Sequence, residues 1–317
     1  LLSIKSMERV MSIQTKIAEG GNSGETTAPR TEWGIDLKIA TKVLEVVDAG
    51  LVSGVGKPIP GQMCVEAAVC YALDLPHGDD PECVSRALRS LKIKLNDSSW
   101  SSNAARTKGL RRLALIQLGS RNHLDDKEFA KRVTELAIRK QVPIALRTTA
   151  SINKQPLHKQ ALLDAANKCE IEGSRQSAFD AREVAREARR AAYAAADAAA
   201  YAYASTYADA ATYAAAYAAA DAAEVAAADA AADADAAAAA YAAAAADVAA
   251  AAAADVAAAA AAAATTYADA ATYAAAAADA DAARDKILSD FAEDVVQILI
   301  DMKVPGVQWL PLTEVQP

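Results

Sequence analysis

One segment of this chain, residues 191–283, consists almost entirely of alanine. It holds 63 Ala among 93 residues, and the other 30 are Tyr, Asp, Thr, Ser, Val or Glu. Alanine has the highest helix propensity, and the other residue types cost at most ~0.7 kcal/mol each in a helix. Neither Gly nor Pro occurs between Gly173 and Pro305. We therefore expect helix through nearly all of this stretch.

Aspartates recur in this tract on a 12-residue grid. At 100° per residue a 12-residue step advances by 120°, so these carboxylates spiral around a helix instead of marking one face. Such a pattern favours the expansion of a short coding repeat that only had to stay helical and soluble. The residues on the grid are Asp197, Asp209, Asp221, Asp233, Asp269 and Asp281.

An apolar stripe follows the tract and needs a partner, because each large apolar side chain gains roughly 1.5–3 kcal/mol on burial. We expect the tract to fold back as a helical hairpin over 173–283, reversing near 229–235, where like charges four residues apart weaken the helix. The C-terminal segment 284–317 would then pack on the body. A coiled coil between subunits is the alternative, but it requires sustained a/d heptads. The stripe comprises Ile287, Leu288, Phe291, Val295, Ile298, Leu299 and Met302.

The remainder predicts an all-α body over 35–172 after a flexible leader, 1–34. Apolar residues recur at helical spacing, and Gly, Pro and polar clusters separate the periodic segments. Asp80-Pro81 has the form of an N-cap followed by a proline at the first helical position. Pro143 is expected to end one helix, and Gly173 another. The six predicted helices span 35–50, 62–75, 81–95, 104–118, 126–141 and 156–171.

Charge is divided unevenly along the chain. Residues 191–283 contain eleven Asp and one Glu and no basic residue, whereas 86–147 contain 15 Lys and Arg against 5 Asp and Glu. This asymmetry predicts either docking of the acidic arm or a polyanionic partner. Clustered basic residues suit phosphates, and Trp100 could stack on a base. The candidate nucleic-acid contacts are Arg86, Arg89, Lys92, Lys94, Arg106, Lys108, Arg111 and Arg112.

Cys64 is the one catalytic candidate, and it is a weak one. It lies in the first turn of a predicted helix, where free N–H groups and the helix dipole lower a thiol pKa. The run from Cys64 through Ala68, Ala72 and Leu75 to Pro76 resembles the nucleophile helix of transglutaminase-like cysteine peptidases. That resemblance implies Cys64 as nucleophile, followed by strands that carry a His and an Asp. The alternative is that Cys64 is a small buried hydrophobe.

A zinc site formed by Cys64, Cys70, His77 and Cys83 is not expected. Structural zinc sites use C-x2–4-C pairs, whereas the gaps here are five, six and five residues. Cys64 and Cys70 also point 240° apart on one helix. No metal and no cofactor is therefore predicted.

Residues 57–100 and 287–310 resemble segments of a bacterial and phage protein family that carries an Ala-rich helical tract, and the resemblance implies no activity. No secretory signal or membrane span is evident, so we expect a cytoplasmic location. The favoured function is a non-catalytic structural or protein-interaction module using the acidic Ala-rich surface, with a protein partner or self-association. The alternatives are nucleic-acid association through 86–147 and a cysteine enzyme using Cys64.

Overall fold

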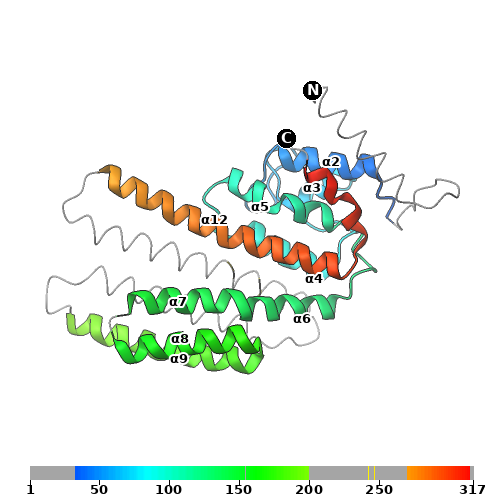
Figure 1. The fold of residues 1–317 in the computed structure, drawn as a ribbon. Helices are drawn as coiled ribbons and strands as arrows, with labels where there is room; N and C mark the ends of the chain where they lie inside the picture. Colours follow the sequence, from blue (N-terminus) through cyan, green and yellow to red (C-terminus); the bar gives the residue numbers. More distant parts are fainter. Residues whose placement is uncertain (1–32, 154, 200–241, 243–245, 247–269, 315–317) are drawn as a thin grey trace.

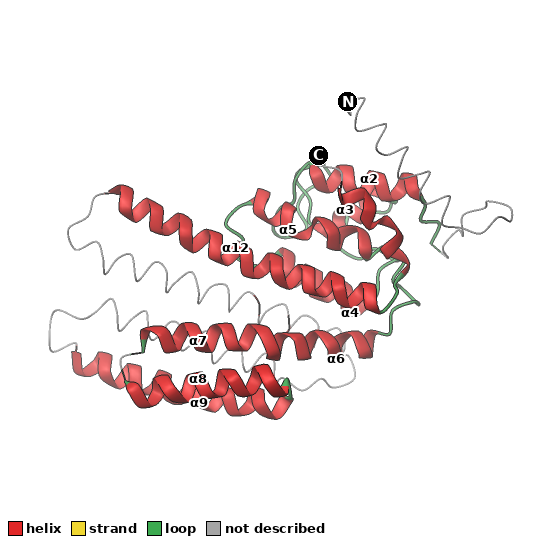
Figure 2. Ribbon diagram, viewed as in Figure 1, coloured by secondary structure: helices red, strands yellow, loops and turns green. Residues whose placement is uncertain are grey.

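The computed structural model describes residues 33–153, 155–199, 242, 246 and 270–314. The described residues form nine α-helices, one π-helical turn and one 3-10 helix, with two isolated β-bridges and no sheet (Figure 2). The prediction of an all-α protein is confirmed. None of the described helices is both long and apolar enough to cross a membrane.

The first four helices correspond to predicted ones, and apart from the start of α4 their ends agree with the prediction to within three residues. They are α2 (Leu37–Asp48), α3 (Val65–Ala72), α4 (Arg86–Asn96) and α5 (Asn103–Ile116). Each begins after a side chain that accepts a hydrogen bond from a backbone N–H three residues on, which is how an N-cap satisfies a free donor. The caps are Asp36, Cys64, Ser85 and Ser102.

The predicted start of α4 at Asp80-Pro81 is wrong. The helix begins five residues later, because Ser85 caps it by accepting from Leu88 N. Cys83 and Val84 precede the helix as buried loop residues, with Cys83 O accepting from Arg121 N. Burial of these two side chains therefore outweighs the local preference of the Asp-Pro pair.

The predicted helix end before Pro143 is also wrong. α6 (Asp126–Leu136) continues through the π-helical turn η1 (Ala137–Gln141) into α7 (Val142–Ile152), and Figure 1 shows them as one long rod. A proline inside a helix normally clashes with the carbonyl four residues before it. Here Val142 N bonds to Ala137 O, five residues back, so the turn is widened just before Pro143. The π-turn thus accommodates the ring.

Three further helices complete the described chain, followed by a 3-10 helix. α8 (Pro156–Glu172) ends at Gly173, whose φ of 60° is the left-handed conformation predicted for a stop signal. α9 (Arg175–Ala199) and α12 (Ala270–Asp301) are the described ends of the long breaker-free stretch, and η2 (Pro305–Glu314) follows. The predicted reversal near 229–235 lies outside the described residues.

Buried side chains gather in two clusters that divide within the π-turn. The first contains Ala137 and the second Ile138. The first cluster contains buried residues of the five helices from α2 through α6 and of α12 and η2. It also includes two residues of the alanine tract, Ala242 and Ala246. The second joins η1, α7, α8 and α9, which lie side by side in Figure 1.

The C-terminal helix packs on the first cluster. Leu288, Phe291, Val295 and Leu299 of α12 are buried there, and α12 contacts α5 and α6. Polar bonds flank this contact. Lys140 Nζ lies 2.7 Å from Asp294 Oδ1, and Asp285 Oδ1 accepts from Ser101 N.

The part of α9 that precedes the alanine tract packs through small side chains. In α9 the fully buried residues Ala178, Ala181, Ala185 and Ala188 follow one another at steps of three, four and three. These positions form one stripe of the helix, and methyl side chains let two helix axes approach closely. α9 contacts α8 along this stripe.

Candidate functional site

The segment between α2 and α3 forms a projecting loop with many internal hydrogen bonds. We call residues 52–62 the α2–α3 loop. Its ends are joined by Val52 N to Met63 O at 3.0 Å. Within it, Lys57 N donates to Gln62 O and Gln62 N donates to Ile59 O. Residues 53–60 are exposed, so this backbone is held by hydrogen bonds and not by burial.

Two glycines allow the loop to close so tightly. Gly56 has φ +73°, and a Cβ on it would lie 2.0 Å from Gln62 O. Gly54 has φ +67° and open space around it. Gly54 N donates to Asp97 Oδ1 at 2.7 Å, which ties the loop to the end of α4. The loop is therefore held both by its own backbone hydrogen bonds and by its bond to the end of α4.

Apolar side chains project from this loop into solvent. Val55 is 37% exposed and Ile59 is 48% exposed. Exposed single hydrophobic residues are ordinary on protein surfaces. Here, however, both residues lie on a loop whose backbone is held by hydrogen bonds. Binding residues occur disproportionately on loops that a rigid scaffold positions.

A buried ion pair lies beneath the loop. Lys92 Nζ of α4 is 2.8 Å from Glu66 Oε1 of α3, and both side chains are fully buried. Burial raises the pKa of Glu66, while the charge of Lys92 opposes the rise. Burial likewise lowers the pKa of Lys92, while Glu66 opposes the fall. Apart from this ion pair, the carboxylate of Glu66 has no hydrogen-bond partner among the described residues.

Cys64 lies next to this pair as the N-cap of α3. Its Sγ accepts from Ala67 N at 3.3 Å. Burial raises the pKa of the Cys64 thiol; the bond from Ala67 acts in the opposite direction, and the charge of Glu66 adds to the rise. The expected lowering by the helix N-terminus is therefore outweighed. The thiol is predominantly protonated at neutral pH.

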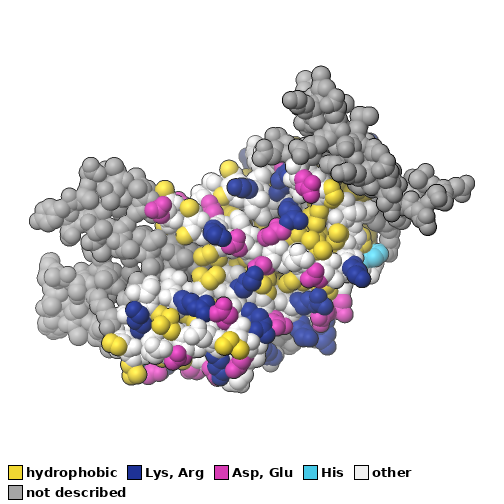
Figure 3. Space-filling model, in the orientation of Figure 1, with side chains coloured by type: hydrophobic (Ala, Val, Ile, Leu, Met, Phe, Trp, Pro, Cys, Tyr) yellow, Lys and Arg dark blue, Asp and Glu magenta, His cyan; other side chains and the backbone are white. Residues whose placement is uncertain are grey.

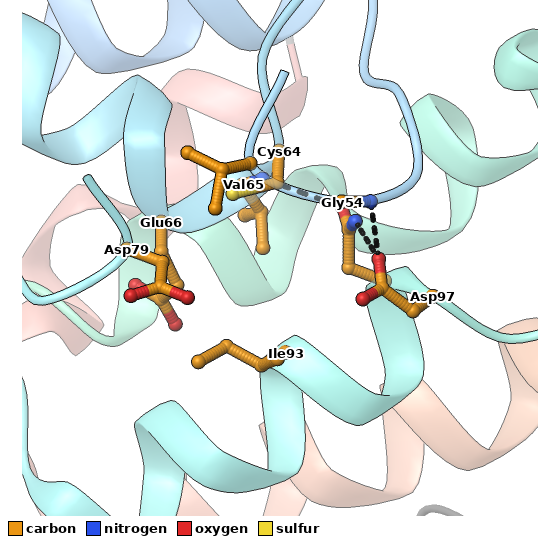
Figure 4. Close-up of a pocket in the computed structure, with 9 residues that line it drawn as sticks. Gly54, Cys64, Val65, Glu66, Asp79, Ile93 and Asp97 are labelled. Atoms are coloured by element: carbon orange, nitrogen blue, oxygen red, sulfur yellow. Dashed lines mark hydrogen bonds between the residues drawn. The ribbon is translucent and has the colours of Figure 1, made fainter. Parts of the chain in front are cut away.

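A small cavity opens between the loop, α3 and α4 (Figure 4). Its volume is about 70 Å³. Figure 4 shows Glu66 and Asp79 close together on one side and Asp97 on the other, with Ile93 below. Three carboxylates and no basic side chain line it. The lining residues are Gly54, Val55, Cys64, Val65, Glu66, Asp79, Ile93, Asn96 and Asp97.

Two of the predicted nucleic-acid contacts are buried, so they cannot reach a phosphate. Lys92 is paired with Glu66, and Arg106 is 6% exposed with Nε donating to Asn96 O at 2.7 Å. Trp100, predicted to stack on a base, is buried as well, and its Nε1 donates to Leu95 O. Helix packing, not ligand binding, accounts for all three positions.

Three more of these residues are engaged in ion pairs within the chain. Arg89 pairs with Asp79, Arg111 with Asp48 and Arg112 with Glu293. The other three are exposed, and nucleic-acid binding through them remains a prediction. Figure 3 shows Lys and Arg interleaved with Asp and Glu over the visible face. The exposed three are Arg86, Lys94 and Lys108.

The strands that the cysteine-peptidase resemblance implies are not found in the part of the chain that the structure describes. Within the described residues, helices α4 to α8 follow Cys64. His77 bonds to Gly56 O through Nε2 at 3.1 Å and thereby supports the loop. Among the described residues, no three His, Cys, Asp or Glu side chains converge on a metal position.

The Glu66–Lys92 pair was missed by our sequence reasoning, although the sequence carries a signal for it. Leu88, Lys92 and Leu95 are spaced by four and three residues, which places Lys92 on the buried face of α4. Glu66 likewise lies inside an otherwise apolar run, 63–70. One buried acid and one buried base on adjacent helices predict a pair.

No protein-family model, curated protein or solved structure matches this chain. The two resemblances inferred from short motifs therefore receive no support from whole-chain comparison.

Proposed function

We propose that this protein is a non-catalytic binding module that recognises a partner polypeptide through the α2–α3 loop. The observation that carries the proposal is the exposure of Val55 and Ile59 on a loop whose backbone is bonded in place. Binding to a preorganised loop avoids the entropy cost of ordering it. Removing the apolar surface of Val55 and Ile59 from water on binding would favour association.

This proposal keeps the predicted interaction role and moves it to another surface. The predicted surface was the acidic Ala-rich tract, and residues 200–241 and 247–269 lie outside the described chain. Binding through that tract remains a separate prediction. The loop proposal does not depend on it.

The test is a selection of displayed random peptides on the full chain. We expect the selected peptides to bind the double variant Val55→Ser/Ile59→Ser roughly tenfold more weakly, as loss of two buried contacts predicts. The matched control is Leu157→Ser/Ile171→Ser, which removes two exposed apolar side chains of α8. Equal binding to the loop variant and the wild type would overturn the proposal. Circular dichroism checks that both variants remain folded.

A thiol enzyme is the second candidate, because Cys64 lines the cavity beside Glu66. It requires a reactive thiolate, and the raised pKa of Cys64 opposes one. Cys169 provides an internal reference, since burial raises its pKa to about 11 and it lies in the second cluster. Alkylation of Cys64 much faster than of Cys169 at pH 7 would favour the enzyme. Equally slow alkylation of both would reject it.

A further inference from the structure

A groove lies between the π-helical turn and α12, at the junction of the two buried clusters. Its volume is about 260 Å³, and residues of η1, α7 and α12 line it. Ile287 of α12 is one of these residues, and it packs against both clusters. Figure 1 shows α12 running obliquely to the rod that contains α6 and α7. None of the described residues of the α2–α3 loop lines the groove, so it is separate from the surface of the proposed function.

The charges in the lining of this groove are balanced. Each carboxylate that lines it is paired with a lysine or an arginine. A charged ligand would therefore meet no uncompensated opposite charge here. The three ion pairs are Lys140–Asp294, Lys286–Asp290 and Arg112–Glu293.

Two isoleucines give the groove an apolar lining. Ile144 of α7 and Ile287 of α12 both line it, and both are partly buried side chains that pack against the clusters. A ligand with an apolar body would remove more of their surface from water, which favours binding.

A buried carboxamide is a second, independent observation that points to a ligand. Gln141 is the last residue of the π-helical turn, it is 2% exposed, and it lines the groove. Its Oε1 is buried without a hydrogen-bond partner among the described residues. Buried polar atoms are normally bonded, and a carboxamide has no charge that an ion pair could compensate instead. A hydrogen-bond donor in the groove would satisfy this oxygen. Short π-helical turns inside α-helices are also frequent at functional sites.

Size and chemistry together narrow the class of ligand. A volume of about 260 Å³ lies just below the usual range of small-molecule pockets, so the groove suits a single aromatic group and no nucleotide or peptide segment. The balanced charges favour a neutral group, the isoleucines favour an apolar one, and Gln141 Oε1 requires a donor. Indole and phenol each combine a large apolar ring with one N–H or O–H donor.

We propose that this groove binds a neutral aromatic group with one hydrogen-bond donor, an indole or a phenol, whose N–H or O–H donates to Gln141 Oε1. The ring contacts Ile144 and Ile287. This site goes beyond the proposed function and does not depend on it. The ring can belong to a free small molecule or to a Trp or Tyr side chain of a polypeptide, because both present the same ring and the same donor.

The first experiment titrates the full chain with indole and with phenol and follows the binding by NMR. The matched probes are 1-methylindole and anisole, which keep the ring and lack the donor. We expect indole and phenol to shift the resonances of Gln141, Ile144 and Ile287. The methylated probes should bind about tenfold more weakly, as the loss of one hydrogen bond predicts. Equal affinity of the methylated probes, shifts at other residues only, or no shifts at all would each overturn the inference.

A second set of probes identifies where the ring comes from. N-acetyl-tryptophanamide and N-acetyl-tyrosinamide carry the same donors on a capped backbone. Binding of these amides as tight as that of the free rings assigns the ligand to a polypeptide side chain. Much weaker binding of the amides assigns it to a free small molecule. Either result supports the site, provided that the shifts include Gln141.

The third experiment removes the acceptor. Gln141→Leu has a similar volume and replaces an unbonded buried amide with an apolar group, so we expect it to remain folded and to bind indole about tenfold more weakly. The control is Gln117→Leu, because Gln117 is also buried with an unpartnered Oε1 but does not line the groove. The control should bind indole like the wild type, and equal affinities of the two variants would contradict the role of Gln141. Circular dichroism checks both folds; if Gln141→Leu does not fold, the comparison of indole with 1-methylindole on the wild type decides.

Discussion

The most consequential single residues in this chain are Glu66 and Lys92, which share a fully buried ion pair. Two charges removed from water attract each other strongly, yet each loses its hydration. Such a pair contributes little net stability as long as it is intact. Removing one partner leaves the other charge buried and uncompensated.

We therefore predict that Lys92→Met lowers the free energy of unfolding by about 3–5 kcal/mol at pH 7. This loss of unfolding free energy should become smaller as the pH falls. Burial raises the folded-state pKa of Glu66 above its unfolded value, so its protonated form is the one the fold tolerates. Stability in the variant is thus retained below the unfolded pKa of about 4.3 and lost as the pH rises through the folded pKa. Urea unfolding at pH 4.5 and pH 7 measures the difference.

The matched control is the double variant Glu66→Leu/Lys92→Met. It removes both charges and keeps a similar volume, so its free energy of unfolding should equal that of the wild type or exceed it by about 1–4 kcal/mol, and should lie well above that of Lys92→Met. A single variant that is as stable as the wild type at pH 7 would contradict the assigned pair.

The α2–α3 loop is the element on which the proposed function depends most. Its shape relies on Gly56, where a Cβ would meet Gln62 O at 2.0 Å. We predict that Gly56→Ala costs about 1–3 kcal/mol and abolishes peptide binding, because the loop can no longer close. Gly54→Ala has nearly the same positive φ but open space, so it measures the backbone strain alone. Similar stability of the two variants would contradict the close approach. Thermal unfolding and peptide titration provide both readouts.

The alanine stripe of α9 defines a second element with a testable packing. Ala185 is fully buried between α9 and its neighbours. Ala185→Leu should destabilise the protein by about 1–3 kcal/mol, because extra methylene groups cannot fit a close helix contact. Ala104→Leu, at an exposed position of α5, should be nearly neutral. Equal midpoints of urea unfolding for the two variants would show that the stripe is loosely packed.

The presence of most of these helices could be predicted from the sequence, whereas the positions of some helix ends could not. Periodic apolar residues and the stop signal at Gly173 placed α5 and α8 to within two residues. The start of α4 depended on burial of Cys83 and Val84, which no local pattern reveals. The passage through Pro143 depended on a π-turn, a backbone feature without a sequence signature that we could recognise. The site was missed because Lys92 was counted with its exposed basic neighbours, although its helical position placed it inside.

The whole molecule depends on α12, which carries the end of the chain back to the first cluster. Phe291 is fully buried at this contact. We predict that Phe291→Ala lowers the free energy of unfolding by about 3–5 kcal/mol. Phe179→Ala removes the same ring from a position that is 37% exposed and should cost much less. All three Trp residues pack in or against the first cluster, so fluorescence during urea unfolding reports on it directly. A small effect of Phe291→Ala would mean that α12 is dispensable.

The π-turn at Ala137–Gln141 inserts its extra residue at the point where the rod passes from one cluster to the other. One residue corresponds to about 100° of rotation along a helix. The widened turn absorbs this extra residue locally, so the helix on either side keeps the face that a regular helix one residue shorter would present. One continuous rod can therefore place α6 on the first cluster and α7 on the second while it carries one residue more than a regular helix of the same length would hold.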